Sequence, residues 1–306
     1  MTRALKVGIE LPIAERRGRD DVPSWAVITE MALAAEAVGF DSLWIEDHLL
    51  LRPDGEPPQG LWDGWSILCG LAAITSRITL GSFVTCTAFR NPALLAKMAD
   101  TLDEISGGRF VLGLGAGWNE TDFLAFGYPY DHLVGRFEEA ITIVHGLLRD
   151  GAIDFEGRYH QARDGVLQPR GPTPSGPPIM IGASGERMLQ LTARYADIWN
   201  GACTSPERVA PLRDRIDAAC QSVGRDPTTL GRSVAVLVDF TGGQGIPASF
   251  NPARLPPISG TPTQLADALH GFASEGVSHV QLTPLPMTVE SVRALAPVLD
   301  ILDHRG

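Results

Sequence analysis

Segments with strand character and segments with helix character alternate along almost the whole chain, and their number restricts the fold more than any other feature. The strands are expected at eight places, residues 5–11, 42–45, 78–84, 109–114, 178–181, 198–201, 233–240 and 277–282. Eight successive strand–helix units can close into a barrel, whereas an open doubly wound sheet rarely needs so many. We therefore predict an α/β fold, a single (β/α)8 TIM barrel over residues 1–306.

Capping residues support the helices of this reading. Ser24 is a suitable N-cap for a helix at 24–38, and Gly39 stands just beyond its end. Two stretches rich in Gly and Pro interrupt the alternation. In the first, residues 150–177, the part 152–163 could form a small hairpin. The second, residues 241–259, is a long loop after the seventh strand, and such loops usually carry function.

Composition excludes several classes of protein. The 306 residues are 44% hydrophobic and carry a formal net charge of −11, which argues against a nucleic-acid partner. The N-terminus lacks the features of a secretory signal, and no apolar run is long enough to span a membrane. The cysteines and histidines are scattered, without metal-ligand spacing. We expect a cytoplasmic enzyme with no metal site and no membrane or nucleic-acid partner.

The fourth predicted strand ends in a run of alternating glycines. In RFVLGLGAGWNE, residues 109–120, glycine occupies positions 113, 115 and 117. Glycine has no Cβ, so the backbone at these positions could approach a flat ligand closely. The same glycines could instead form only a tight turn. The run also differs from the dinucleotide-binding fingerprint, which needs G-x-G-x-x-G at the start of a helix.

A second glycine-rich strand end lies at PIMIGASGER, residues 178–187. Here the strand leads directly into a helix, so that free backbone N–H groups meet the Ser184 hydroxyl and the Arg187 guanidinium. Such a place suits a phosphate group. The alternative is an ordinary helix start with Ser184 as its N-cap. A serine hydrolase is not indicated, because the last glycine of the G-x-S-x-G pattern is missing.

The predicted strand ends contain one titratable cluster, Asp47–His48. An imidazole titrates near neutral pH, which makes His48 the best candidate for proton transfer, with Asp47 either orienting it or capping the next segment. Alternatively, both side chains only end the strand through hydrogen bonds to the backbone. No second carboxylate has a spacing that favours glycoside hydrolysis. Most aromatic residues at these ends are expected in the core, and only Phe83 and Trp118 are expected to touch a ligand.

Four ordered pieces of the chain resemble the bacterial luciferase-like family, and more closely its oxidoreductases that depend on the deazaflavin coenzyme F420. They are AEAVGFDSLWIEDHL (35–49), the segment from ITSRITLGS to GLGAGW (74–118), PPIMIGASGERMLQLTARYADIWN (177–200) and GTPTQLADALHGFASEGVSHVQL (260–282). The resemblance extends over residues 6–284.

This resemblance implies a (β/α)8 barrel with an insertion after strand seven and a flavin or deazaflavin at the C-terminal mouth. It implies that the ring lies against a bulge, often with a non-proline cis peptide, at the end of strand three. It also implies that Asp47 and His48 are the family's Asp-His pair after strand two, whose His contacts the substrate or the ring near the hydride-carrying carbon. The cofactor-binding residues that it implies are Phe83, Val84 and Thr85 at the bulge, Gly115, Ala116, Gly117, Trp118 and Asn119 after strand four, and Gly182, Ala183, Ser184, Gly185 and Glu186 around the phosphate.

One position departs from the family's sugar-phosphate dehydrogenases, some of which have a carboxylate directly after the strand-four glycines. Trp118 stands there in this chain, which favours a more apolar small-molecule substrate. The leading hypothesis is hydride transfer between reduced F420 and a small organic substrate. An FMNH2-dependent monooxygenase that uses O2, and a cofactor-binding protein without turnover, are the alternatives. The family further suggests a homodimer.

Overall fold

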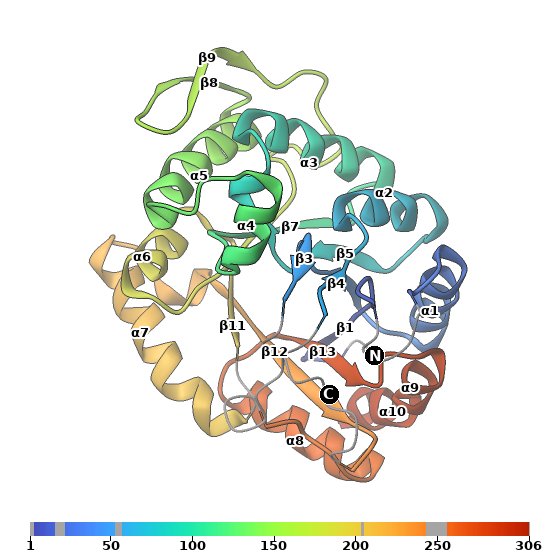
Figure 1. Cartoon of the computed structure of the whole chain (residues 1–306). Helices are drawn as coiled ribbons and strands as arrows, with labels where there is room; N and C mark the ends of the chain where they lie inside the picture. Colours follow the sequence, from blue (N-terminus) through green and yellow to red (C-terminus); the bar gives the residue numbers. More distant parts are fainter. Residues whose placement is uncertain (1–2, 16–21, 53–56, 203–204, 243–255, 306) are drawn as a thin grey trace.

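Eight parallel strands close a barrel in the computed structural model, which describes residues 3–15, 22–52, 57–202, 205–242 and 256–305 (Figure 1). The barrel strands are β1 (Lys6–Glu10), β2 (Ser42–Ile45), β5 (Thr79–Ser82), β7 (Phe110–Gly115), β10 (Ile179–Gly182), β11 (Ile198–Ala202), β12 (Gly231–Asp239) and β13 (His279–Leu285). Pairing of β7 with β10, in which Ile179 lies beside Leu112, closes the ring. The predicted (β/α)8 barrel is confirmed.

Helices surround the barrel. They are α1 (Trp25–Val38), α2 (Gly64–Ile74), α3 (Pro92–Ser106), α5 (Leu133–Asp150), α6 (Glu186–Tyr195), α7 (Val209–Ser222), α8 (Pro262–Ser274), α9 (Val289–Ala294) and α10 (Ala296–Arg305). Buried aliphatic side chains of these helices and of the strands form the core between the two layers, for example Leu80 of β5 with Leu95 and Leu102 of α3. No helix among the described residues is both long and apolar enough to cross a membrane.

Local capping fixes where the helices begin. The Ser24 side chain accepts a hydrogen bond from the N–H of Val27, and Gly39 ends α1 in the left-handed region, as predicted. The sequence also predicts a helix at residues 62–75, but α2 begins at Gly64, because the Asp63 side chain accepts a hydrogen bond from the N–H of Ser66 and so acts as the N-cap. The closing helix is divided at Leu295 into α9 and α10.

The third barrel strand is broken by a bulge. The peptide bond between Phe83 and Val84 is cis, and the strand resumes as β6 (Thr85–Cys86) beside β7. The predicted strand at 78–84 therefore ends at Ser82, and the expected cis peptide is present. Phe83 packs on the fully buried Trp44, with ring centroids 5.7 Å apart.

Two excursions leave the barrel. The hairpin of β8 (Ala152–Glu156) and β9 (Gln161–Val166) lies outside α5, which confirms the hairpin expected at 152–163 (Figure 1). The loop expected at 241–259 follows β12, the seventh barrel strand, and its residues 243–255 lie outside the described part of the chain. Near its end, Ile258 forms a bridge with Val238.

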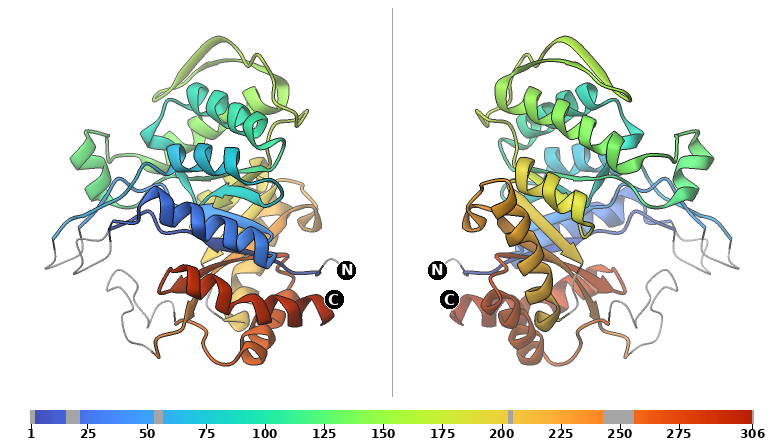
Figure 2. Two further views of the ribbon diagram at one scale, coloured as in Figure 1. Left: turned by 90° about the vertical axis from the view of Figure 1, so that its right-hand side faces the viewer. Right: turned by 90° about the vertical axis from the view of Figure 1, so that its left-hand side faces the viewer.

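A group of short elements covers one end of the barrel. They are β3 (Leu50–Leu51), β4 (Gln59–Gly60) and α4 (Glu120–Phe126), all in connections that follow the carboxyl ends of barrel strands. Figure 2 shows them on the side opposite to the two chain termini. The catalytic residues of TIM barrels lie at this end.

Candidate active site

His48 and Asp122 form the central polar pair of the barrel mouth. The Nδ1 atom of His48 lies 2.7 Å from Oδ2 of Asp122, and the two side chains are 20% and 1% exposed. The other oxygen of Asp122 accepts the N–H groups of Leu49 and Leu50, so α4 is tied to the segment after β2. A neutral His48 donates its Nδ1 proton to Asp122. Its Nε2 atom is therefore the ring nitrogen available to a reactant.

The electrostatics of this pair favour a charged imidazole. Burial lowers the pKa of His48, but the hydrogen bond to Asp122 and the charge of Glu46 outweigh burial and hold this pKa above its usual value. Burial raises the pKa of Asp122, but its hydrogen bonds with His48 and with the N–H of Leu50 outweigh burial and hold it below the usual value. The pair can therefore store a proton near neutral pH and release it from Nε2.

Asp47 does not orient His48, so that part of the sequence interpretation is wrong. Its carboxylate accepts two hydrogen bonds from Arg90, at 2.6 and 2.9 Å, and a third from the N–H of Cys86. Asp47 thus ties the segment after β2 to the segment after β6. Asp122, 74 positions beyond His48, takes the orienting role.

Trp118 stands beside this pair. Its side chain is 71% exposed, and its ring meets the His48 ring edge-on with centroids 5.3 Å apart. The next residue, Asn119, donates its side-chain N–H to the carbonyl oxygen of Leu50 at 3.0 Å. Phe83 and Val84 are half-buried at the bulge. Thr85 is fully buried, and its Oγ1 atom has no hydrogen-bond partner among the described residues.

The glycines after strand four make room for the protein's own side chains. A Cβ at Gly115 would stand 2.7 Å from Cγ2 of Val84. Gly117 has a φ of +82°, and a Cβ there would stand 2.6 Å from Cζ of Phe123. Ala116, between them, is half-buried against the core. Packing within the chain therefore already requires these glycines, and contact between their backbone and a flat ligand stays a prediction.

The start of α6, in contrast, is open. Gly182 and Ala183 are half-buried at the end of β10, whereas Ser184, Gly185 and Glu186 are exposed. Gly185 is the N-cap, no side chain caps this helix, and a Cβ at Gly185 would meet nothing within 4 Å. The alternative in which Ser184 caps the helix is therefore wrong. Uncapped N–H groups at a helix start fit a phosphate.

Two carboxyl groups at the mouth, the buried Glu10 and the half-buried Glu46, were not selected from the sequence. Glu10 ends β1, is 8% exposed and accepts a hydrogen bond from Oγ1 of Thr283 at 2.5 Å. Burial, followed by repulsion from Glu46, raises the pKa of Glu10 to about 8, so this side chain is largely a neutral acid at pH 7. Glu10 and Glu46 lie at the ends of the adjacent parallel strands β1 and β2. Their position at these strand ends was the signal that could have identified them.

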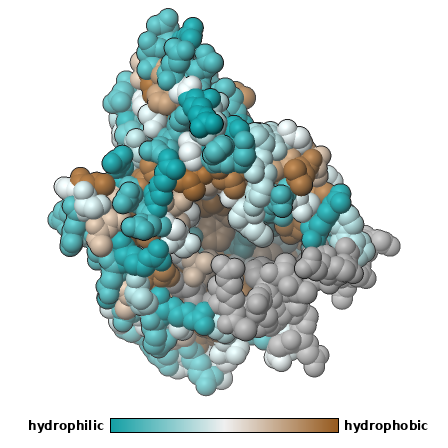
Figure 3. Space-filling view, turned by 60° about the vertical axis from the view of Figure 1, so that its left-hand side comes forward, coloured by the Kyte–Doolittle hydropathy of each residue, from teal (hydrophilic) through white to brown (hydrophobic). Residues whose placement is uncertain are grey.

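The surface near this end of the barrel is hollowed. Figure 3 shows a depression near the centre of its view, with hydrophobic residues along the upper rim. No cluster of metal-ligating side chains occurs in the described ranges. Burial raises the pKa of the Cys86 thiol to about 12, so Cys86 is an unreactive packing residue beneath the site.

Comparison with known proteins identifies the family. The family model described as luciferase-like monooxygenase matches residues 5–241. The chain belongs to this family. A pyrimidine monooxygenase, RutA, from Caulobacter sp. strain K31 is 31% identical over 242 residues, which are 72% of this chain and 66% of that protein. A 5,10-methylenetetrahydromethanopterin reductase from Archaeoglobus fulgidus is 35% identical over 62% of this chain and 53% of its own length. The chain thus spans less than two thirds of these two relatives.

Solved structures of the family share the fold. An F420-dependent secondary alcohol dehydrogenase in complex with an F420–acetone adduct aligns with a TM-score of 0.78 at 17% identity, over 97% of this chain and 99% of that one. Riboflavin lyase (RcaE), with modified FMN and riboflavin, aligns with a TM-score of 0.80 at 19% identity, over 99% and 92% of the two chains. These comparisons show the family and the fold, and they leave the activity and the cofactor open.

Proposed function

We propose that this luciferase-like enzyme transfers a hydride between the deazaflavin F420 and a small organic substrate. The observation that carries the proposal is the His48–Asp122 pair beside the exposed Trp118, at the barrel mouth. This arrangement combines a proton donor, His48, with an aromatic surface, the ring of Trp118. A hydride transfer to a carbon–oxygen or carbon–nitrogen double bond needs a proton at the heteroatom, and this pair can provide it.

The residues around the mouth fit a cofactor of this type. The uncapped start of α6 at Gly185 would hold the phosphate. The bulge at Phe83 and Val84 would support the ring, because these half-buried side chains rest on Trp44. When bound, the deazaflavin would supply or accept the hydride. His48 would hold the accompanying proton on Nε2, and Asp122 would keep the imidazole in its orientation.

The substrate proposed for this site is small and mostly apolar. Trp118 occupies the position where some relatives that act on sugar phosphates carry a carboxylate, and its exposed ring offers apolar contact rather than a charge. Glu10, neutral near pH 7, could donate a hydrogen bond but would not attract a cation.

Replacement of His48 tests the catalytic assignment. In His48→Ala, turnover with reduced F420 should fall by about 10²- to 10⁴-fold, because the proton store is lost. The dissociation constant for F420 should stay nearly unchanged. Stopped-flow kinetics and a binding titration measure the two quantities separately. The exposed His270 on α8 provides a matched control, since His270→Ala should change neither quantity. Normal turnover in His48→Ala would reject the assignment.

A second candidate is an FMNH2-dependent monooxygenase that uses O2. It is favoured by the RutA relatives, which are named pyrimidine monooxygenases and match 72% of this chain. A third outcome, cofactor binding without turnover on any acceptor, would make the protein a carrier. The cytoplasmic location and the homodimer, expected from the family to form through the second and third helices, remain predictions.

A further inference from the structure

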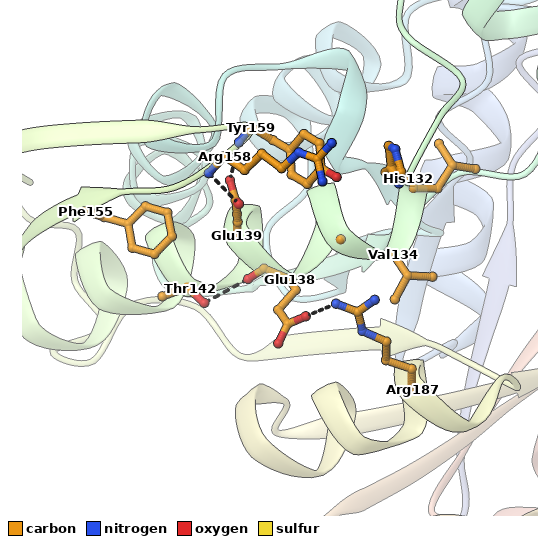
Figure 4. A pocket seen from close by; sticks show the side chains of 11 residues that line it. His132, Val134, Glu138, Glu139, Thr142, Phe155, Arg158, Tyr159 and Arg187 are labelled. Atoms are coloured by element: carbon orange, nitrogen blue, oxygen red, sulfur yellow. Dashed lines mark hydrogen bonds and ion pairs between the residues drawn. The ribbon is translucent and has the colours of Figure 1, made fainter.

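A groove of about 800 Å³ lies on the flank of the barrel, outside the site described above. Its walls are the start of α5, the turn of the β8–β9 hairpin and the start of α6 (Figure 4). The side chains that characterise it are His132, Glu138, Arg158, Tyr159 and Arg187. The hairpin turn forms one wall, and Arg187 reaches in from the opposite side.

The hairpin wall is fixed in place by one carboxylate. Glu139 of α5 accepts the backbone N–H groups of Arg158, Tyr159 and His160, at 2.7–2.8 Å. The approach is so close that a Cβ at Gly157 would stand 2.4 Å from Oε2 of Glu139. Three backbone donors thus bind the charge of Glu139, and the turn is held in position before any ligand arrives.

Cationic groups gather on this wall around Tyr159. The guanidinium carbons of Arg136 and Arg158 lie 4.6 and 5.2 Å from the centre of its ring. Arg136 also pairs with Asp131. Within the described ranges, no carboxylate lies within 4 Å of the Arg158 guanidinium, which leaves its charge available to an anion.

The second cation belongs to the phosphate end of the site. Arg187 is the residue after Glu186 at the start of α6, and it pairs across the groove with Glu138 (Figure 4). The two side chains are 60% and 37% exposed, so the pair contributes little stability and an incoming carboxylate can replace Glu138. The groove therefore adjoins the start of α6, where the phosphate is proposed to bind.

We infer that this groove binds the acidic tail of the cofactor, through Arg158 and Arg187. Coenzyme F420 carries a lactyl group and glutamate residues beyond its phosphate, whereas FMN ends at the phosphate. A chain that continues from the N-terminus of α6 away from the barrel mouth would pass Arg187 and then reach Arg158. The inference rests on the proposed function. It assigns to the groove the part of the cofactor that distinguishes a deazaflavin from FMN.

The test compares two ligands that differ only beyond the phosphate. Full F420 and the deazaflavin 5′-phosphate, which lacks the tail, are titrated into the protein at low salt. F420 should bind about tenfold more tightly, as two exposed charge pairs allow, and the difference should shrink at high salt. The double variant Arg158→Ala/Arg187→Ala should lose this difference, so that it binds the two ligands with equal affinity. Both arginines are exposed, so the fold should be retained.

Arg163→Ala is the matched control. Arg163 lies on the same hairpin, pairs with Glu156 and does not line the groove, so this variant should keep the preference for F420. Equal affinity of the wild-type protein for both ligands, or a preference that survives in the double variant, would overturn the groove assignment and leave the proposed function standing. Binding of FMN with no binding of either deazaflavin would overturn the proposed function together with the assignment.

Discussion

At the scale of single residues, the chemistry of the mouth depends on how Asp122 sets the charge of His48. A buried carboxylate at 2.7 Å stabilises the imidazolium, and the same carboxylate accepts two backbone N–H groups that fix its own position. The partner therefore controls both the orientation of the imidazole and the pH at which Nε2 becomes a base. Geometry and charge can be separated by substitutions at position 122.

Asp122→Asn should shift the pH dependence of the enzyme. The amide oxygen can still accept the Nδ1 proton, but the negative charge is gone, so the pKa of His48 should fall. If neutral His48 accepts the proton in the oxidative direction, kcat/KM rises with pH through this pKa. The rising part of the plot of kcat/KM against pH should then move by about one pH unit toward lower pH in the variant. Steady-state kinetics from pH 5 to about 9 measures the shift.

Asp122→Ala should lower kcat further, because it also removes the oxygen that accepts the Nδ1 proton and orients the His48 ring. If the pH dependence of kcat/KM and the value of kcat in Asp122→Asn both equal those of the wild-type protein, Asp122 only supports the fold. Sequence reasoning could propose His48 from its place at a strand end. It could not propose Asp122, since nothing in the spacing of residues 48 and 122 signals a contact that only the closed barrel creates.

At the scale of elements, the short helix α4 carries the site. It contributes Asp122 to the mouth and Phe123 to the packing beneath it, where Phe123 contacts Phe89 with ring centroids 5.3 Å apart. Gly117 lets the chain turn from β7 toward this helix. The precision of the His48–Asp122 contact therefore depends on backbone that precedes α4.

Two glycine variants distinguish packing from backbone strain at α4. Gly127 ends the helix with a φ of +77°, and a Cβ there would meet nothing within 4 Å. Gly127→Ala should therefore cost only about 1 kcal/mol of unfolding free energy. Gly117→Ala adds contacts at 2.6 and 2.8 Å with Phe123 and Cys86, so it should cost roughly 2–4 kcal/mol. Denaturant unfolding measures both values. Equal losses in the two variants would contradict the packing argument.

Elements were predictable where hydrophobic periodicity and capping residues agree. Ser24 and Gly39 place the ends of α1, predicted at residues 24–38, to within a residue. The small β3–β4 pair was missed, because two-residue strands have no periodicity. The packing role of the strand-four glycines could not be predicted either. Only the folded chain shows that Val84 and Phe123 occupy the space that the missing side chains leave.

At the scale of the whole molecule, closure of the barrel brings the site together. Glu10, His48, Trp118 and the start of α6 are distant in sequence, and they lie at the same end of the barrel because each stands at or after the carboxyl end of a parallel strand. The count of eight strand–helix units was sufficient to predict this ring. The loops at this end determine the chemistry. Their side chains have no regular hydrophobic pattern, so their contacts cannot be predicted from the sequence.

The central claim is that the mouth accepts a deazaflavin as its hydride carrier, and a competitive cofactor titration tests it most directly. Purified protein is titrated with F420 and with FMN by fluorescence, under anaerobic conditions for the reduced forms. The account predicts a dissociation constant for F420 in the micromolar range or below, and one for FMN at least about tenfold higher. Tighter binding of FMN, with oxygen consumed when reduced FMN and a substrate are supplied together, would contradict it.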